Sequence, residues 1–247
     1  MYLSDAAAKQ KVLAEKYDGV ESDAYRADCA RIDAHEPFEY ILGYADFLGC
    51  KIDLSYTPMV PRDETAFWTK RVIEEWKDKG PMAAIDAYAG SGNIGVALAK
   101  YLPEAHVTFN EIDEKLMPQI AKSLEMNDID QKRATLIAGD SLEKITGTFD
   151  AFCANPPYVD PAGEADMDPE MYFEPRIAFF GSSDGYGHHR ELIKEGKKYL
   201  TPRGVMYIEC DMTQVETLKE ILRDTDWKWE LWNDPYGHEG VMVLRQQ

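Results

Sequence analysis

The second half of the chain alternates between short apolar runs and longer segments in which apolar residues recur at helical spacing. The apolar runs predict buried strands at 82–87, 106–110, 134–138, 149–154 and 205–209. The longer segments predict helices at 93–102, 114–127, 188–199 and 214–222, and two closing strands are expected near 227–232 and 241–245. Such alternation is typical of an α/β protein in which helices cover both faces of one sheet.

The first third of the chain follows a different pattern. Two helices are expected, from Ser4 or Asp5 to Tyr17 and from Ser22 to Ala34, because Ser and Asp are good helix N-caps. They contain few large apolar residues, so they predict a small arm lying on the main domain.

The segment from 36 to 56 combines aromatic and branched residues with Gly43 and Gly49, a pattern that predicts short strands or a hairpin. A loop then leads to a helix that ends near Lys79. The stripe that this helix is expected to turn inward consists of Phe67, Val72 and Trp76. The predicted division of the chain is a shortened helical arm over 1–35, a β-hairpin linker over 36–60 and a main domain over 61–247.

At 247 residues, the chain is long enough for one sizeable core and a small accessory domain. No apolar stretch reaches the length of a membrane span, and the N-terminus lacks the regions of a secretory signal. The four cysteines are scattered, which favours free thiols in a reducing cytoplasm. The five histidines form no ligand cluster, so no metal site is expected. We therefore expect a cytoplasmic protein, and nothing in the sequence requires more than a monomer.

The formal net charge of −18 bears on the choice of partner. An acidic chain repels the phosphate backbone of nucleic acids unless it carries a local basic patch, and no cluster of Lys and Arg stands out. Such a surface would steer a basic protein partner toward it, and it equally serves solubility alone. The charge argues against direct nucleic-acid binding and leaves these two explanations open.

The segment Asn155-Pro156-Pro157-Tyr158 follows the predicted strand at 149–154. Two consecutive prolines cannot donate to a sheet, so the strand must end there. The Asn155 side chain offers a carbonyl oxygen, and the proline carbonyls add acceptors beside the aromatic face of Tyr158. A rigid corner of this kind suits an amino group attached to a planar system. We interpret the four residues as a site for methylating a planar nitrogen.

A glycine-rich turn, Gly90-x-Gly92-x-x-Gly95, follows the predicted strand at 82–87 and satisfies the dinucleotide fingerprint. Glycines let the backbone approach a ligand closely. Nicotinamide dinucleotides bind such turns with their pyrophosphate against the following helix, so an NAD site is one interpretation of this turn.

Acidic or amide side chains stand at the ends of four predicted strands: Asp86, Glu111, Asp140 and Asn155. Ligands of open α/β sheets bind at these strand ends. Glu111 can accept both hydroxyls of a ribose, and Asp140 can accept an adenine amino group. Asp86 suits an ammonium or a sulfonium and would repel a pyrophosphate. The series therefore favours S-adenosylmethionine (SAM) over NAD.

These residues lie within a longer resemblance. The chain is similar to the HemK/PrmC-type peptide chain release factor N5-glutamine methyltransferases over about residues 28–247. The segments that carry the resemblance are PFEYILGYADFLG at 37–49, PRDET at 61–65, DAYAGSGNIGVALA at 86–99, NPPY at 155–158, EPRIAFFGSSDG at 174–185, IEC at 208–210 with Gln214, and DPYGHEG at 234–240. Their combination in this order is far more specific than any single motif.

The resemblance implies a Rossmann-like, seven-stranded class I SAM-dependent methyltransferase, with a hairpin linking the sheet to N-terminal helices. It implies that SAM is the cofactor, that S-adenosylhomocysteine is the product, and that a peptide chain release factor is the protein substrate. Asn155, Pro156, Pro157 and Tyr158 would receive the glutamine side chain. The implied cofactor site comprises Tyr88, Ala89, Gly90, Ser91, Gly92, Glu111, Ile112, Asp140, Ser141 and Asn155, with Thr65 nearby, and the chemistry described above adds Asp86.

Three features depart from the family pattern. The region before the hairpin is shorter than the family's N-terminal domain, which helps to grip the release factor. The cofactor turn reads Tyr88-Ala89-Gly90 where the family favours Gly-Thr-Gly. The C-terminal motif reads His238-Glu239-Gly240 where the family carries an arginine after the glycine.

The expected reaction is direct methyl transfer from the sulfonium to a carboxamide nitrogen. Two other classes stay open: an adenine N6-type nucleic-acid methyltransferase, because Asn-Pro-Pro-Tyr also serves that chemistry, and an NAD-dependent oxidoreductase.

Several charged residues have two interpretations. Arg62 and Glu64 form an exposed ion pair or orient the linker. The segment 174–176 fixes the long loop after the active strand, or that loop covers the substrate channel, which we favour. Glu209 is a strand-end charge or a loop anchor, and we do not place it in the site.

Overall fold

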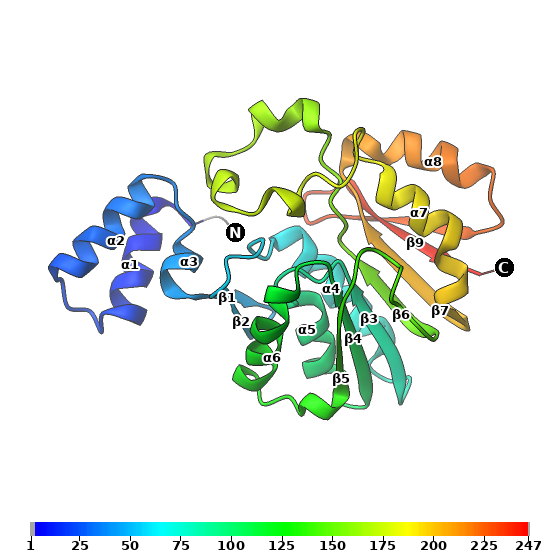
Figure 1. The fold of residues 1–247 in the computed structure, drawn as a ribbon, viewed down its shortest axis with the longest axis horizontal. Helices are drawn as coiled ribbons and strands as arrows, with labels where there is room; N and C mark the ends of the chain where they lie inside the picture. Colours follow the sequence, from blue (N-terminus) through cyan, green and yellow to red (C-terminus); the bar gives the residue numbers. More distant parts are fainter. Residues whose placement is uncertain (1–2, 247) are drawn as a thin grey trace.

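A mixed sheet of seven strands forms the centre of the computed structural model, which describes residues 3–246 (Figure 1). The strand order is β5-β4-β3-β6-β7-β9-β8. The strands are β3 (Met82–Ala87), β4 (Ala105–Glu111), β5 (Ala134–Ala138), β6 (Phe149–Ala154), β7 (Leu200–Glu209), β8 (Lys228–Asn233) and β9 (Glu239–Arg245). The first five in this order are parallel, and β9 is antiparallel to both of its neighbours. The predicted seven-stranded α/β architecture is confirmed.

Helices cover both faces of the sheet (Figure 1). One face packs against α4 (Asp63–Trp76), α5 (Asn93–Tyr101) and α6 (Met117–Met126), and the other against α7 (Gly187–Glu195) and α8 (Val215–Arg223). Because successive strand residues point to opposite faces, Ala84 of β3 belongs to the first core, whereas Ile85 and Ala87 belong to the second. Both faces are buried, as a largely parallel sheet requires.

The N-terminal helices form a small projection beside this domain. They are α1 (Asp5–Lys16), α2 (Asp23–Asp33) and the short α3 (Phe38–Leu42). Ser4 and Ser22 cap α1 and α2 through their side chains, as predicted. Figure 1 shows α1 and α2 at one end of the molecule, away from the sheet, so the arm does not lie flat on the main domain.

A hairpin of β1 (Tyr44–Phe47) and β2 (Cys50–Asp53) follows the arm. It confirms the predicted hairpin, whereas α3, within the same segment, was not predicted. An ion pair of 2.8 Å between Lys11 and Asp46 joins the arm to the hairpin.

Two details of the prediction are wrong. Phe67 does not face inward: the residue is 40% exposed, whereas Val72 and Trp76 are buried. At 100° per residue, Phe67 lies about 140° around the helix from Val72, and Trp68 occupies the buried face instead. Strand β7 also begins at Leu200, five residues earlier than predicted, through a register shift opposite Phe149.

The segment between β6 and α7 is irregular and contains three short 3₁₀ helices, η3 (Pro161–Asp166), η4 (Pro169–Phe173) and η5 (Arg176–Ala178). Figure 1 shows it in yellow-green. The remaining 3₁₀ helices are η1 (Glu114–Leu116), η2 (Gln131–Arg133), η6 (Gly196–Tyr199) and η7 (Met212–Gln214). No helix within residues 3–246 combines the length and the apolar character needed to cross a membrane.

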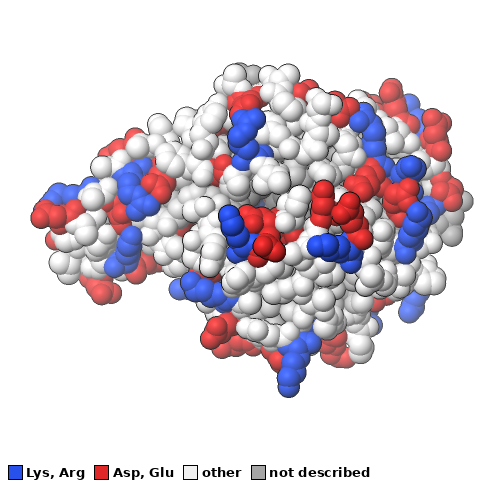
Figure 2. All heavy atoms as spheres, viewed as in Figure 1, with Lys and Arg blue, Asp and Glu red and all other residues white. Residues whose placement is uncertain are grey.

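Acidic and basic side chains are mixed on the surface. On the face shown in Figure 2, Lys and Arg lie singly or in small groups among Asp and Glu, with broad uncharged areas between them. This face therefore presents no continuous basic surface.

Candidate active site

Asn155, the first residue after β6, lies where two cavities meet. The larger cavity, of about 530 Å³, is bordered by the ends of β3, β4 and β5, and the smaller cavity, of about 420 Å³, by the ends of β6 and β7. Asn155 lines both cavities, together with Met59 and Ala178. An atom at this position can therefore contact two ligands at once.

The larger cavity collects most of the predicted cofactor residues: Tyr88, Gly90, Glu111, Ile112, Asp140, Ser141 and Asn155. Glu111 fixes the shape of the turn, because its Oε2 accepts the Gly90 N–H at 2.8 Å and its Oε1 accepts the Asp113 N–H at 2.9 Å. Burial raises the pKa of Glu111, and these backbone N–H groups oppose that shift. Each oxygen retains a lone pair, so the carboxylate can still accept the hydroxyls of a diol.

Tyr88, where the family favours glycine, forms part of the wall of the larger cavity. Its φ is +59°, in the left-handed region that costs a side chain energy and suits glycine. Its hydroxyl lies 2.6 Å from Ser141 Oγ and 3.3 Å from His188 Nδ1. Ser141 Oγ in turn donates to Glu191. These contacts hold the Tyr88 ring in place and explain how the bulkier residue is accommodated.

Five predicted cofactor residues are buried and do not line the larger cavity: Thr65, in the first turn of α4, and Asp86, Ala89, Ser91 and Gly92, in and beside the glycine-rich turn. Asp86 Oδ2 accepts the Gly95 N–H at 2.7 Å, and burial raises its pKa well above the usual range. Its Oδ1 is buried and finds no hydrogen-bond partner among the described residues. Ser91 Oγ donates to Asn93 Oδ1 at 3.0 Å. The hydrogen bonds of Asp86 and Ser91 thus fix the shape of the glycine-rich turn.

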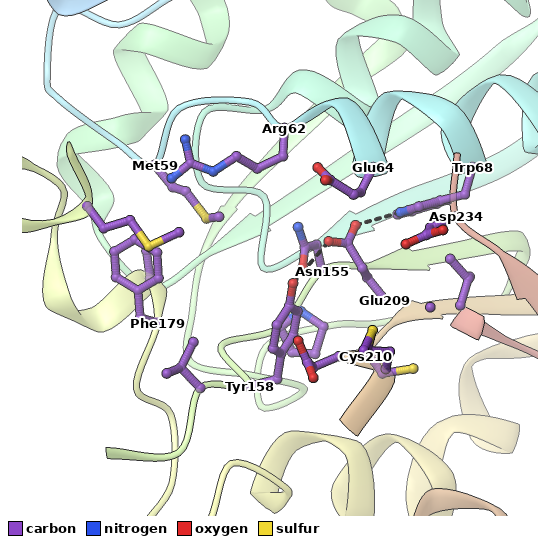
Figure 3. Close-up of a pocket in the computed structure, with 18 of the residues that line it drawn as sticks. Met59, Arg62, Glu64, Trp68, Asn155, Tyr158, Phe179, Glu209, Cys210 and Asp234 are labelled. Carbon is purple, nitrogen blue, oxygen red and sulfur yellow. Dashed lines mark hydrogen bonds between the residues drawn. The ribbon is translucent and has the colours of Figure 1, made fainter. Parts of the chain in front are cut away.

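The smaller cavity contains Asn155, Pro156 and Tyr158 in its wall, together with Glu209 (Figure 3). Glu209 is buried and accepts three bonds: from Thr65 Oγ1 at 2.7 Å, from Trp68 Nε1 at 2.6 Å and from the Tyr158 hydroxyl at 3.2 Å. Thr65 Oγ1 also accepts Asn155 Nδ2 at 3.3 Å. Glu209 therefore belongs to the site, contrary to the sequence interpretation.

Two further contacts fix the corner and the loop. Gln214 Nε2 donates to the Tyr158 carbonyl at 2.9 Å and so holds the backbone that leaves the Asn-Pro-Pro-Tyr corner. Glu174, whose side chain is fully buried, pairs with Arg62 at 2.5 Å and accepts the Val60 N–H at 3.0 Å. Burial raises the pKa of Glu174, and Arg62 opposes that shift.

Arg62 thus pairs with Glu174, in the distant loop, and this pair connects the start of α4 to that loop. Ala178 and Phe179 of the loop line the smaller cavity, and the interpretation that this loop covers a substrate channel stays a prediction. Glu239, in the motif that departs from the family, also lines this cavity and pairs with Lys219 at 2.7 Å.

Glu209, Trp68 and His188 are residues of the two cavities that sequence reasoning did not identify. Trp68 was detectable, because helical spacing from Val72 and Trp76 places it on the buried face of α4. For Glu209 the local sequence gave no signal. Within residues 3–246, no group of three or more His, Cys, Asp or Glu side chains is arranged to hold a metal ion.

Comparisons with known proteins agree with this geometry. Residues 68–171 match the family described as Methyltransferase small domain. The release factor glutamine methyltransferase of Geobacter sulfurreducens is 35% identical over 204 residues, which cover 80% of this chain and 69% of that protein. The enzyme of the same name from Deinococcus radiodurans is 26% identical and covers 94% and 80%. The ribosomal protein uL3 glutamine methyltransferase of Francisella tularensis is 27% identical and covers 95% and 73%.

Solved structures show the same fold at lower identity. A methyltransferase from Pyrococcus furiosus superposes with a TM-score of 0.58 at 16% identity, covering 88% of this chain and 98% of that chain. The ribosomal protein L11 methylase of Lactobacillus delbrueckii subsp. bulgaricus gives 0.57 at 17% identity, covering 78% and 83%.

The sheet, with its strand-end cavities, is that of a class I SAM-dependent methyltransferase. Within that class, the identity and coverage shared with the Geobacter protein are decisive. The chain belongs to the release factor glutamine methyltransferase family.

Proposed function

We propose that this enzyme transfers a methyl group from SAM to the side-chain amide nitrogen of a glutamine in a peptide chain release factor. The observation that carries the proposal is the position of Asn155 in the walls of both cavities. SAM would occupy the larger cavity and the substrate glutamine the smaller one. Their reacting atoms would meet at Asn155.

The chemistry of the larger cavity fits SAM. Its volume of about 530 Å³ is ample for a nucleoside ligand. Glu111 would accept the ribose hydroxyls, and Asp140 would accept the adenine amino group. Tyr88, Gly90, Ile112 and Ser141 would complete the contacts, with Thr65, Asp86, Ala89, Ser91 and Gly92 supporting them. When bound, SAM supplies the electrophilic methyl group, and S-adenosylhomocysteine is the product.

The residues after β6 would orient the nucleophile. An amide nitrogen is a poor nucleophile because its lone pair is delocalised into the carbonyl. Asn155 Oδ1 and the Pro156 carbonyl would accept its two N–H bonds, and Tyr158 would pack against the amide plane. Positioning of this kind supplies up to about 7–11 kcal/mol. The nitrogen would form a bond to the methyl carbon while the bond from that carbon to sulfur breaks and leaves its electron pair on the neutral thioether, and the nitrogen would then release a proton to solvent.

The identity of the protein substrate rests on the relatives. Two of the relatives named above act on release factors and one on ribosomal protein uL3, so uL3 is the second candidate substrate. We further propose that residues 1–35 form a recognition arm, 36–60 a linker and 61–247 the catalytic domain.

Methyl transfer from labelled SAM to purified release factor, with uL3 tested in parallel, checks the reaction. We expect label on one glutamine amide, and a decrease of at least about 10²-fold in Asn155→Ala, because that variant loses a preorganised acceptor. Asn233→Ala, an exposed position on β8, is the matched control. Full activity in Asn155→Ala, or label on another residue type, would refute the proposal.

Ligand-induced thermal shifts test the cofactor. A ligand that binds only the folded state raises stability by about 2.7 kcal/mol at a concentration 100 times its Kd. We expect SAM and S-adenosylhomocysteine to raise the Tm and NAD to leave it unchanged. A shift with NAD alone would favour the oxidoreductase alternative.

The nucleic-acid alternative is not favoured. The net charge is −18, and basic side chains are dispersed on the face shown in Figure 2. Naked DNA and RNA belong in the same labelling assay, and we expect no methylation of either.

A further inference from the structure

We propose that Glu209 is a positioning residue that fixes the orientation of the Asn155 amide through the hydroxyl of Thr65. The inference rests on the proposed function, in which Asn155 Oδ1 accepts an N–H bond of the substrate amide. The three side chains come from the end of β7, the corner after β6 and the first turn of α4, and 144 positions separate Thr65 from Glu209.

The orientation follows from the number of protons available. An asparagine amide can be turned so that its NH₂ and its oxygen exchange places, and only its hydrogen-bond network decides between the two. Thr65 has one hydroxyl proton, which it donates to Glu209 Oε2 at 2.7 Å. Its oxygen can then only accept, so Asn155 must face it with Nδ2, at 3.3 Å. Asn155 Oδ1 is thereby left to accept from the substrate.

Other contacts hold Glu209 in this role. Trp68 Nε1 donates to the same Oε2 at 2.6 Å, and the Tyr158 hydroxyl donates to Oε1 at 3.2 Å (Figure 3). Burial raises the pKa of Glu209. Oε2 accepts two bonds in either protonation state, because a proton on the acid would sit on Oε1. The orientation of Thr65 and Asn155 therefore depends on an acceptor at Glu209 Oε2 and does not depend on the charge of Glu209.

Substitutions at Thr65 test whether its hydroxyl links Glu209 to Asn155. Thr65→Val keeps the shape but removes the hydroxyl, and we expect kcat to fall about 10²-fold, as misplacement of a reacting group does. The KM for SAM should change little. Thr65→Ser retains the hydroxyl and should stay within about tenfold of wild type. Thr69→Val, one turn later on the buried face of α4, is the matched control and should leave kcat unchanged. Wild-type kcat in Thr65→Val would overturn the proposal.

Substitutions at Glu209 separate positioning from proton transfer. In Glu209→Gln the amide oxygen can accept from Trp68 and Thr65, while the NH₂ donates to the Tyr158 oxygen. We expect kcat within about tenfold of wild type and an unchanged pH profile. Glu209→Leu offers no acceptor, so its kcat should fall about as far as that of Thr65→Val. The double variant Thr65→Val/Glu209→Leu should have a kcat no lower than that of the less active single variant. If Glu209→Gln were as inactive as Glu209→Leu, and its pH–rate profile lacked a pKa that the wild type shows, the positioning role of Glu209 would be refuted.

The side-chain NMR signals of Asn155, assigned by their loss in Asn155→Ala, give a readout that needs no substrate. We expect one Nδ2 proton to be protected from solvent exchange in wild type and in Thr65→Ser and to lose that protection in Thr65→Val. The same protection of the Asn155 Nδ2 proton in Thr65→Val would overturn the proposal. Absence of methyl transfer to any glutamine by the wild-type enzyme would instead reject the proposed function and leave this measurement valid.

Discussion

Thr65 and Thr69 lie one turn apart on the buried face of α4, yet their hydroxyls differ in what they contact. Thr65 bonds to Asn155 and Glu209, whereas Thr69 Oγ1 is buried with no hydrogen-bond partner among the described residues. A buried polar atom without a partner costs folding free energy that an isosteric apolar group does not.

Thr69→Val should therefore stabilise the protein. We expect the free energy of unfolding to rise by about 1 kcal/mol, because the methyl group replaces a hydroxyl that makes no bond. Urea unfolding of wild type and variant measures this free energy. Thr65→Val, which breaks two hydrogen bonds, should instead lower it. A loss of stability in Thr69→Val would show that its hydroxyl is bonded.

The sequence was sufficient to predict residues whose role is written in a short motif. Asn155, Pro156 and Tyr158 are found from their order alone, and they do line one cavity. Glu209 was missed because its partners lie 51 to 144 positions away in the chain, so only the folded sheet brings them together. Its neighbours in sequence carry no information about those distant contacts.

At the scale of elements, Gly95 decides how closely α5 approaches β4. A Cβ at this position would lie 2.2 Å from Cε1 of Phe109, far inside van der Waals contact. The third glycine of the turn thus serves the packing of helix on strand, whereas the sequence suggested only an approach of backbone to ligand.

Gly95→Ala is expected to destabilise the fold by about 1–3 kcal/mol, because an overpacked core must shift to admit the methyl group. The Tm should fall by about 2–4 °C for each kcal/mol. Thermal unfolding measures the change against Gly163→Ala, where the added Cβ meets no atom within 4 Å. Equal Tm values for the two variants would contradict this account.

The predicted bounds of strands were best where an apolar run meets turn residues on both sides, as at 82–87 and 149–154. The start of β7 was missed because Pro202 and Gly204 normally end strands. Here they lie where the register shifts, and a Cβ on Gly204 would be 2.6 Å from the Phe149 carbonyl oxygen. Helix α3 was missed because it has only five residues, although Gly43 ends it in a left-handed conformation.

At the scale of the whole molecule, the arm meets the linker and the loop around a third cavity, of about 240 Å³, which we call the arm cavity. Its wall includes Lys11, Glu39, Arg62 and Glu170. Burial raises the pKa of Glu39 from 4.5 to about 7, and the nearby Glu170 adds to the shift. Glu39 therefore makes the folded state sensitive to pH near neutrality.

The sign follows from proton binding. Between pH 4.5 and about 7 the folded state holds a proton on Glu39 that the unfolded state has lost, so the contribution of Glu39 to the free energy of unfolding decreases as pH rises through this range. The full effect is at most about 3 kcal/mol. Glu39→Gln should remove this contribution.

Urea unfolding at pH 5, 6, 7 and 8 compares wild type, Glu39→Gln and the exposed control Glu104→Gln. We expect the difference between wild type and Glu39→Gln to grow with pH, and the difference from Glu104→Gln to stay constant. A difference for Glu39→Gln that does not vary with pH would contradict the assignment.

Strand β9 is the last element among the described residues, but it lies inside the sheet, between β7 and β8. Its residues Val241, Met242, Val243 and Leu244 belong to the cores on both faces. During synthesis the N-terminal residues of a chain emerge first, and each domain generally folds as a unit. This sheet, however, cannot join β8 to β7 until residues 239–245 have left the ribosome and inserted between them. The sheet of this methyltransferase is thus completed by the strand at 239–245, so the pairing of β7 with β8 through β9 is a late step of folding.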